Sequence, residues 1–161
     1  QNVYGPGQSL KNPYTGILSI FSTLLLQGKE VNIFEDGKES RDFVFIDDVV
    51  AATVAAIDSD KTNEAYNVGT GEATDVLTVA NLLKSSYGSG GEIRVSGNFR
   101  IGDIRHNIAD LSKIKNDMSF APKVSFDEGV KAFSEWVKTQ KINDSGYERS
   151  VSELRAKGLL K

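Results

Sequence analysis

A short segment with two arginines, Arg100-Ile101-Gly102-Asp103-Ile104-Arg105, holds the most chemically suggestive spacing in this sequence. Arg100 and Asp103 are three residues apart with Gly102 between them, which favours a turn after the strand expected at 92–95. The planar guanidinium of Arg100 suits phosphate oxygens and is never deprotonated in proteins, while the Asp103 carboxylate can accept hydrogen bonds from sugar hydroxyls. A surface ion pair of little energetic worth is the other interpretation of these residues.

Arg41 is a third candidate for anion binding. It follows an Asp-Gly turn at 36–37 and precedes an apolar strand, so its head can reach a cleft. His106 is the single histidine and lacks the spacing of a serine-histidine-acid triad or of an H-E-x-x-H helix. The chain has no cysteine, which excludes a disulfide framework and a thiolate metal site. We therefore expect local anion binding and no metal centre.

The composition is that of an ordinary globular protein. The chain has 161 residues, enough for one domain or one lobe of a larger enzyme, with 39% hydrophobic and 25% charged residues. Its net charge of −3 provides no overall positive field for nucleic acid or anionic lipid. No apolar run reaches transmembrane length and no signal peptide is visible. The composition thus favours a cytoplasmic protein that binds neither nucleic acid nor membrane.

Short strands and helices are expected to alternate, which predicts an α/β or α+β fold with few strands. An Asn12-Pro13 start and a capping box at 125–128 mark two of the helices. The helix at 49–57 is almost wholly apolar and is expected to be buried. The expected strands are 2–4, 31–34, 41–46, 65–68 and 92–95, and the expected helices 13–26, 49–57, 78–87, 112–118, 126–137 and 151–157.

Several motifs of complete dehydrogenases are missing. The chain contains no G-x-G-x-x-G loop, and Gly69-Thr70-Gly71 lacks the third glycine. No tyrosine is followed four residues later by lysine, and no P-loop is present. The chain alone is expected to be a binding lobe without catalytic or cofactor-binding residues. Because it opens at Gln1 with what reads as the end of a strand, we also expect a fragment or a processed product.

Four segments, in this order, resemble the C-terminal half of NAD-dependent nucleotide-sugar epimerases and dehydratases, which are extended short-chain dehydrogenases similar to UDP-glucose 4-epimerase. The segments are Asn2-Val3-Tyr4-Gly5-Pro6-Gly7-Gln8, Arg41-Asp42-Phe43-Val44-Phe45-Ile46-Asp47-Asp48-Val49, Tyr66-Asn67-Val68-Gly69-Thr70-Gly71 and Arg100-Ile101-Gly102-Asp103. The resemblance covers nearly the whole chain. It implies a small mixed α/β substrate-binding lobe over 1–161, with 138–161 as a peripheral tail and last helix and the Rossmann domain absent.

The resemblance also implies roles for five residues. Asn2 would lie between the sugar, the diphosphate and the nicotinamide, Arg41 and Arg100 would hold the diphosphate, Asp103 would bind the ribose, and Phe34 would line the nucleobase. NAD and the catalytic Tyr-x-x-x-Lys would belong to an N-terminal Rossmann half, which is the implied partner. This chain would bind and orient the nucleotide sugar while that half transfers hydride and proton.

The substrate and the exact reaction stay open. The family's UDP-galactose-type epimerases carry an Asn-Leu pair at the start of the first helix, which Tyr14-Thr15-Gly16-Ile17-Leu18 does not match. The alternatives are a UDP- or dTDP-sugar 4-epimerase, a 4,6-dehydratase, a non-catalytic nucleotide-sugar binding module and an interaction domain. A homodimer of the full-length protein is also left open. A lobe without its Rossmann partner should also expose an apolar seam.

Overall fold

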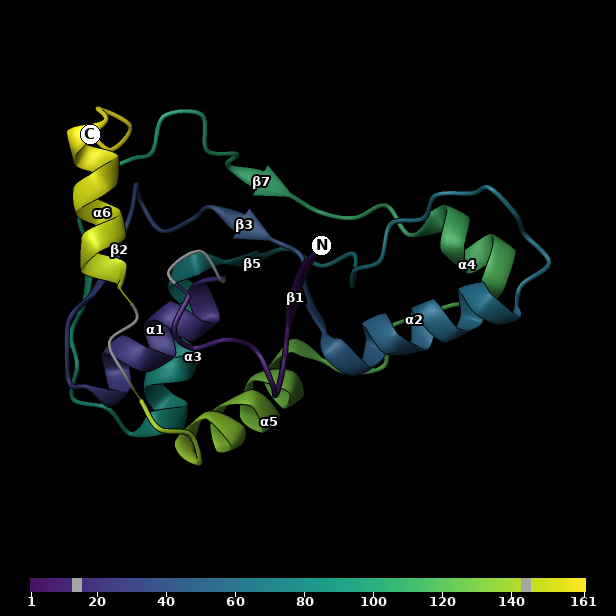
Figure 1. Cartoon of the computed structure of the whole chain (residues 1–161), viewed down its shortest axis with the longest axis horizontal. Coiled ribbons are helices and arrows are strands. Elements are labelled where there is room, and N and C mark those ends of the chain that lie inside the picture. The colour runs from purple at the N-terminus through teal and green to yellow at the C-terminus, as the bar shows by residue number, and fades with distance from the viewer. Residues whose placement is uncertain (13–15, 143–145) are drawn as a thin grey trace.

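The computed structural model describes residues 1–12, 16–142 and 146–161. Its main body is a mixed α/β unit, as expected, in which three helices share one hydrophobic core (Figure 1). These helices are α1 (Ile17–Leu26), α3 (Val76–Tyr87) and α5 (Phe126–Lys138). Asp75 caps α3 through the Thr78 amide, and Ser125 and Glu128 form the capping box expected for α5. Each helix buries the apolar face that its sequence spacing indicates.

The core forms where α5 crosses beneath the first strand. Tyr4 is buried among Phe45, Phe126 and Phe133 in edge-on contacts, with ring centroids 5.6–6.4 Å apart. A Cβ at Gly129 would collide with the Tyr4 hydroxyl, so the glycine inside α5 permits this close approach. Burial raises the pKa of the Tyr4 hydroxyl strongly, and its partner is the Phe126 carbonyl oxygen at 3.3 Å.

The strands form three small sheets. β1 (Asn2–Tyr4) pairs in parallel with β4 (Phe43–Phe45), and β2 (Val31–Ile33) pairs in parallel with β6 (Ile93–Val95). In the third sheet β3 (Ser40–Arg41) lies between β5 (Thr74–Asp75), which is antiparallel, and β7 (His106–Asn107), which is parallel. The third sheet brings residues 41 and 103–107 together from distant parts of the chain.

A second, smaller cluster lies away from the main body. Helices α2 (Ile46–Asp58) and α4 (Ser112–Met118) form a separate arm, at the right of Figure 1. Only Ala52, Ile114 and Phe120 are buried at its centre. The expectation that α2 would be buried is wrong, because Val50, Val54 and Ile57 remain 54%, 50% and 76% exposed. Thus α2 presents an apolar face to the outside.

Other boundaries also differ from the sequence predictions. No strand forms at 65–68. The predicted strand 41–46 is split into β3 and β4 at Asp42, whose carboxylate accepts hydrogen bonds from the loop amides of Thr70 and Ala109. Helix α1 begins at Ile17 after Gly16, and the predicted start at Pro13 lies outside the described residues. The last helix, α6 (Tyr147–Ala156), starts four residues before the predicted Val151. No described helix is long and apolar enough to cross a membrane.

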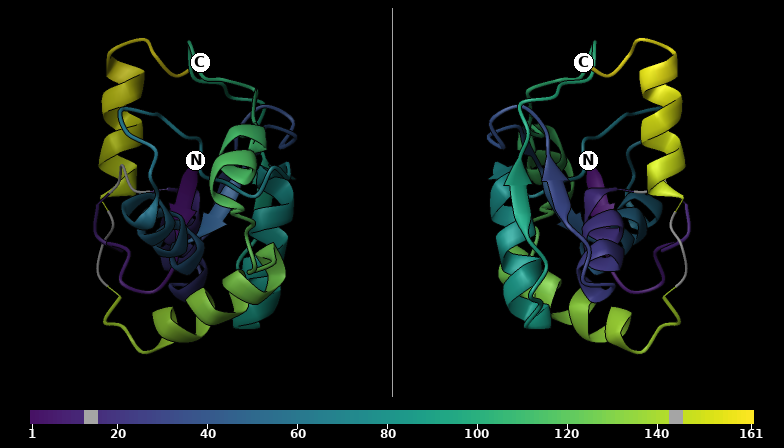
Figure 2. Two further views of the ribbon diagram at one scale, coloured as in Figure 1. Left: turned by 90° about the vertical axis from the view of Figure 1, so that its right-hand side faces the viewer. Right: turned by 90° about the vertical axis from the view of Figure 1, so that its left-hand side faces the viewer.

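Helix α6 lies at the edge of the main core, against which its first residue, Tyr147, packs. The end-on views place α6 on one side of the molecule and α3 on the other, with α5 crossing below them (Figure 2). No residue of α6 is fully buried. After the helix the chain runs beside 99–101, where Phe99 and Lys161 exchange backbone hydrogen bonds of 2.8 and 3.0 Å. This pairing holds the end of the chain against the segment that carries Arg100.

Candidate functional site

A cavity of about 410 Å³ opens between β2, β3, the start of α1 and α6. All five residues singled out from the sequence line it: Asn2, Phe34, Arg41, Arg100 and Asp103. They come from β1, from the residue after β2, from β3 and from the turn before β7. The volume lies in the range of about 300–1,000 Å³ typical of small-molecule sites. The fold therefore gathers these residues at one site, whatever each of them does there.

Arg41 is the best-held cation of the cavity. Its side chain is 19% exposed. Its Nη1 donates to the carbonyl oxygens of Ser40 at 2.9 Å and Arg105 at 3.1 Å, and its Nη2 lies 3.1 Å from Asp103 Oδ1. Strand alternation explains the orientation, since Ser40 turns its hydroxyl to His106 Nδ1 while Arg41 lines the cavity. The guanidinium is thus fixed by backbone acceptors.

Arg100 and Asp103 form the turn that the sequence predicted. The Asp103 amide donates to the Arg100 carbonyl at 3.2 Å, and Gly102 has φ of +82°, a left-handed conformation that glycine adopts without strain. Arg100 Nη2 lies 2.9 Å from Asp103 Oδ2. The Arg100 guanidinium also lies over the Phe34 ring, 5.7 Å from its centroid. Two cations, one carboxylate and one aromatic ring therefore share a wall of the cavity.

Asn2 lies at the edge where β1 meets β4. Its backbone amide donates to the Asp42 carbonyl at 2.9 Å, and its side-chain Nδ2 reaches the same oxygen at 3.3 Å. This leaves the side-chain oxygen of Asn2 as an acceptor at the cavity wall. Phe34 lies one residue beyond the end of β2, where the predicted strand would have included it.

Sequence reasoning missed one whole wall of the cavity. Helix α6 contributes Tyr147, Ser150, Val151 and Leu154. Burial raises the pKa of the Tyr147 hydroxyl, against the opposing effect of Arg100 and Arg155. The spacing of Tyr147, Val151 and Leu154 by four and three residues is a helical apolar stripe that could have indicated a covered face. Nothing in the sequence says that this stripe faces Phe34 and Arg100.

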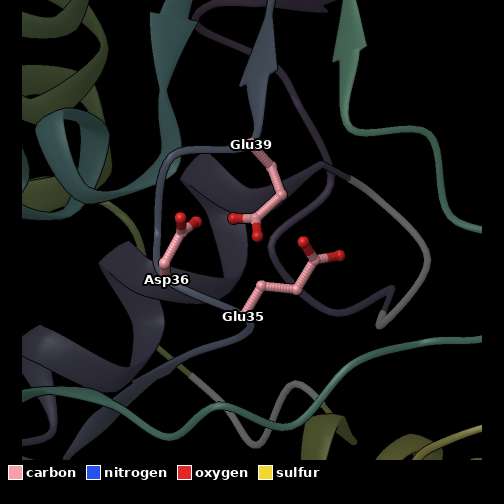
Figure 3. A group of neighbouring side chains, drawn as sticks. All are labelled: Glu35, Asp36 and Glu39. Carbon is pink, nitrogen blue, oxygen red and sulfur yellow. The ribbon is translucent and has the colours of Figure 1, made fainter.

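Three acids lie together beside the cavity: Glu35, Asp36 and Glu39 (Figure 3). Arg105 meets this cluster from outside, with nitrogen–oxygen distances of 2.7 Å to both Glu35 and Asp36 and 3.9 Å to Glu39. The Arg105 hydrogen bond lowers the pKa of Asp36. Burial and the neighbouring Glu35 raise the pKa of Glu39, whose Oε1 is buried without a hydrogen bond. Because Arg105 already pairs with these acids, the cluster is a poor site for a metal cation.

The segment Gly69-Thr70-Gly71 serves a structural purpose instead of binding a phosphate. The Thr70 and Gly71 amides donate to the Asp42 carboxylate at 2.7 and 2.9 Å, and the Ala109 amide adds a third backbone donor at 3.1 Å. A nucleotide phosphate would need the two amides that Asp42 already holds. This loop therefore does not offer its amides to a phosphate, and Asp42 has a structural contact with it.

Two acids lie at the start of α2, Asp47 and Asp48. Asp48 is buried and accepts hydrogen bonds from the Lys123 and Val124 amides at 2.9 and 3.1 Å. Asp47 is exposed in the first turn of α2, where its negative charge interacts favourably with the positive end of the helix dipole, and the N-cap residue is Phe45. His106 is exposed and does not line the cavity.

Comparison with known proteins places these features in a family. Residues 1–69 match the model of the NAD dependent epimerase/dehydratase family. The chain is 41% identical to dTDP-L-rhamnose 4-epimerase of Burkholderia thailandensis over 138 residues, which cover 85% of this chain and 38% of that protein. It is 35% identical to UDP-glucose 4-epimerase of Mycolicibacterium smegmatis, with 80% of this chain and 41% of that protein covered.

A solved structure shows the same arrangement of the chain. UDP-glucose 4-epimerase of Thermotoga maritima, determined with UDP-glucose, has a TM-score of 0.76 and 40% identity, over 85% of this chain and 43% of that one. The chain thus spans about two fifths of the length of the relatives it matches. By its sequence and its fold, this chain belongs to the NAD dependent epimerase/dehydratase family.

Proposed function

We propose that this chain is the substrate-binding part of a nucleotide-sugar 4-epimerase, with UDP- or dTDP-sugars as the substrate class. The observation that carries the proposal is the convergence of Arg41, Arg100, Asp103, Phe34 and Asn2 on one cavity. Both 4-epimerase relatives are more similar to this chain than the dTDP-glucose 4,6-dehydratase of Actinoplanes, which is 27% identical. The similarity supports epimerisation over dehydration.

Each cavity residue has a defined task in this proposal. Arg41 and Arg100 hold the diphosphate, because a guanidinium offers phosphate oxygens paired donors. Asp103 accepts hydrogen bonds from the ribose hydroxyls, and Phe34 packs against the nucleobase. Asn2 contacts the sugar from the β1–β4 edge. By fixing the substrate in one orientation, these contacts supply the positioning that a proton or hydride transfer requires.

The chemistry itself is assigned to a separate Rossmann half. Among the solved relatives, UDP-glucuronic acid 4-epimerase of Bacillus cereus was determined with UDP-glucuronic acid and NAD. NAD supplies a hydride acceptor when bound, and the glycine-containing loop at 69–71 is not assigned to it, since Asp42 holds the amides of Thr70 and Gly71. The exposed apolar face of α2 (Val50, Val54 and Ile57) is the surface assigned to contact with that half.

Titration calorimetry of the chain with UDP-glucose and dTDP-glucose tests the binding role. Arg41→Ala and Arg100→Ala should each weaken binding by about 1.5–3 kcal/mol, as expected for a hydrogen bond to a charged group. Arg94→Ala is the matched control, because Arg94 is exposed in β6 and does not line the cavity. Unchanged affinity in both variants, or no binding of any nucleotide sugar to the unaltered chain, would refute the proposal.

A further inference from the structure

One carboxylate occupies both cations of the cavity. Asp103 Oδ1 lies 3.1 Å from Arg41 Nη2, and Asp103 Oδ2 lies 2.9 Å from Arg100 Nη2. The Ile104 amide donates to Oδ1 as well, at 3.0 Å. Both oxygens of Asp103 are thus engaged, and each guanidinium that would hold a diphosphate is already paired with a negative charge. The three side chains together carry a net charge of +1.

The two guanidinium groups are held in place without Asp103. Arg41 Nη1 is fixed by the carbonyl oxygens of Ser40 and Arg105. Arg100 lies over the Phe34 ring, and its backbone is held by the pairing of 99–101 with the end of the chain. A carboxylate that moved by side-chain rotation would therefore leave Arg41 held by two backbone acceptors and Arg100 over the Phe34 ring. The side chain of Asp103 is 32% exposed, so it has room to move.

We propose that Asp103 is a specificity-determining residue, an internal counter-ion that admits nucleoside diphosphates and screens out anions that lack hydroxyl groups. This inference rests on the proposed function and goes beyond it. A nucleoside diphosphate brings phosphate oxygens for the arginines and ribose hydroxyls that donate to the displaced carboxylate. Inorganic diphosphate offers phosphate oxygens but no hydroxyl groups. It must therefore either bind beside the negatively charged Asp103 carboxylate or displace that carboxylate without giving it a new donor. The carboxylate therefore favours one class of anion over the other.

The neighbouring charges do not alter this argument. The other acids that line the cavity are Glu35 and Glu39, and Arg105 pairs with the first at 2.7 Å and lies 3.9 Å from the second. Arg105 is therefore committed to the acidic cluster, whereas Arg41 and Arg100 form ion pairs with Asp103. Removing the charge of Asp103 should expose both of them to any anion.

The test compares inorganic diphosphate and UDP as ligands in titration calorimetry. Asp103→Asn keeps the shape of the side chain and removes its charge. It should bind inorganic diphosphate about tenfold more tightly than the unaltered chain, as loss of a like charge near the anion requires. Its affinity for UDP should not rise in parallel, because the ribose exchanges a charged carboxylate with two acceptor oxygens for a neutral amide with one. The ratio of the two affinities should therefore fall.

Two further variants separate charge from structure. Asp103→Glu retains the carboxylate and should keep the weak affinity for inorganic diphosphate. Asp58→Asn removes the same charge from an exposed position at the end of α2 and should change neither affinity. Should Asp103→Asn fold poorly, Asp103→Ser removes the charge with a smaller polar side chain and should show the same gain.

The outcomes distinguish the two proposals. If the unaltered chain binds UDP but Asp103→Asn binds inorganic diphosphate no more tightly, the screening role of Asp103 is wrong and the proposed function stands. If Asp58→Asn shows the same gain as Asp103→Asn, the effect is one of overall charge and the inference is again wrong. If the unaltered chain binds no UDP, both proposals fail together.

Discussion

The two hydrophobic clusters of this protein use similar residues but differ in how they are covered. In the main cluster, α1, α3 and α5 enclose Phe133, Val130 and Leu83, none of which is exposed. In the arm, α2 and α4 meet over Ala52, Ile114 and Phe120, and the opposite face of α2 is open. The difference shows that one region is complete in itself, whereas the other has an apolar face that a further surface could cover.

The largest effect is expected in the main cluster. Phe133→Ala should lower the free energy of unfolding by about 3–5 kcal/mol, because it removes a fully buried ring and leaves a cavity among rigid neighbours. Ile114→Ala in the arm should cost nearer to about 2 kcal/mol, at the low end for such a change, since a small cluster can collapse around the gap. Urea denaturation followed by Trp136 fluorescence measures the first loss, because Trp136 lies 5.9 Å from Phe133, centroid to centroid.

Circular dichroism measures both variants on a common scale. Equal losses for Phe133→Ala and Ile114→Ala would contradict the comparison, since they would mean that the arm is packed as rigidly as the main body. A transition of Ile114→Ala that occurs in two steps would sharpen it by showing that the arm unfolds separately.

A buried acid, Asp42, connects the main body to the arm. Asp42 has four donors on its carboxylate, from Thr70, Gly71 and Ala109, and it ties the loops that lead to the arm to the strands of the main body. Asp42→Asn replaces one acceptor oxygen with an NH2 group, which is itself a donor and faces the donors that the carboxylate oxygen had satisfied. It should lower the free energy of unfolding by about 2–3 kcal/mol, the range for hydrogen bonds to a charged group.

Thermal and urea unfolding of Asp42→Asn check this value. Asp47→Asn is the control, because Asp47 is an exposed acid in the first turn of α2. A loss below about 1 kcal/mol for Asp42→Asn, no larger than an ordinary neutral hydrogen bond, would mean that the loops hold without this carboxylate.

Glu39 in the cavity wall is the opposite case, a buried acid whose Oε1 has no hydrogen bond and lies 3.9 Å from Arg105. Its raised pKa means that the folded chain retains the proton more readily than the unfolded chain. The stability of the unaltered protein should therefore fall as pH rises from the ordinary range of a glutamate through the raised value. Glu39→Gln removes this loss and should stabilise the protein at pH 7 by about 1 kcal/mol, the lower range for a buried polar group without a partner.

The pH dependence identifies the cause. The gain from Glu39→Gln should disappear as pH falls below the ordinary value for glutamate, since Glu39 is then protonated in both states. Glu92→Gln, at an exposed position, should show no such trend. A gain in stability that is independent of pH would show that Glu39→Gln acts through packing and not through loss of ionisation.

The sequence predicts the main cluster better than the arm, because burial follows from local pattern in the first but not in the second. Helices α3 and α5 carry apolar residues on one face and clear caps, so their position and burial follow from local pattern. Helix α2 is apolar on all sides, and such a pattern cannot say which face a neighbour covers. Residue type and spacing singled out Arg41, Arg100 and Asp103, and the family resemblance added Asn2 and Phe34. The α6 wall and Glu39 were not singled out, because their approach to Phe34 and Arg41 depends on contacts between segments far apart in the chain.

The smallest effect on stability, and the sharpest test of the open face, comes from α2. Val54→Gln with Ile57→Gln should change the free energy of unfolding by less than about 0.5 kcal/mol, because both side chains are already largely exposed. The unaltered chain should self-associate through this face at high concentration, and the double variant should not. Sedimentation velocity over a concentration series measures this. Val95→Gln with Ile108→Gln alters two exposed apolar residues outside α2 and should leave association unchanged. A chain that stays monomeric throughout, or a control pair that blocks association equally well, would show that the exposed face of α2 needs no cover.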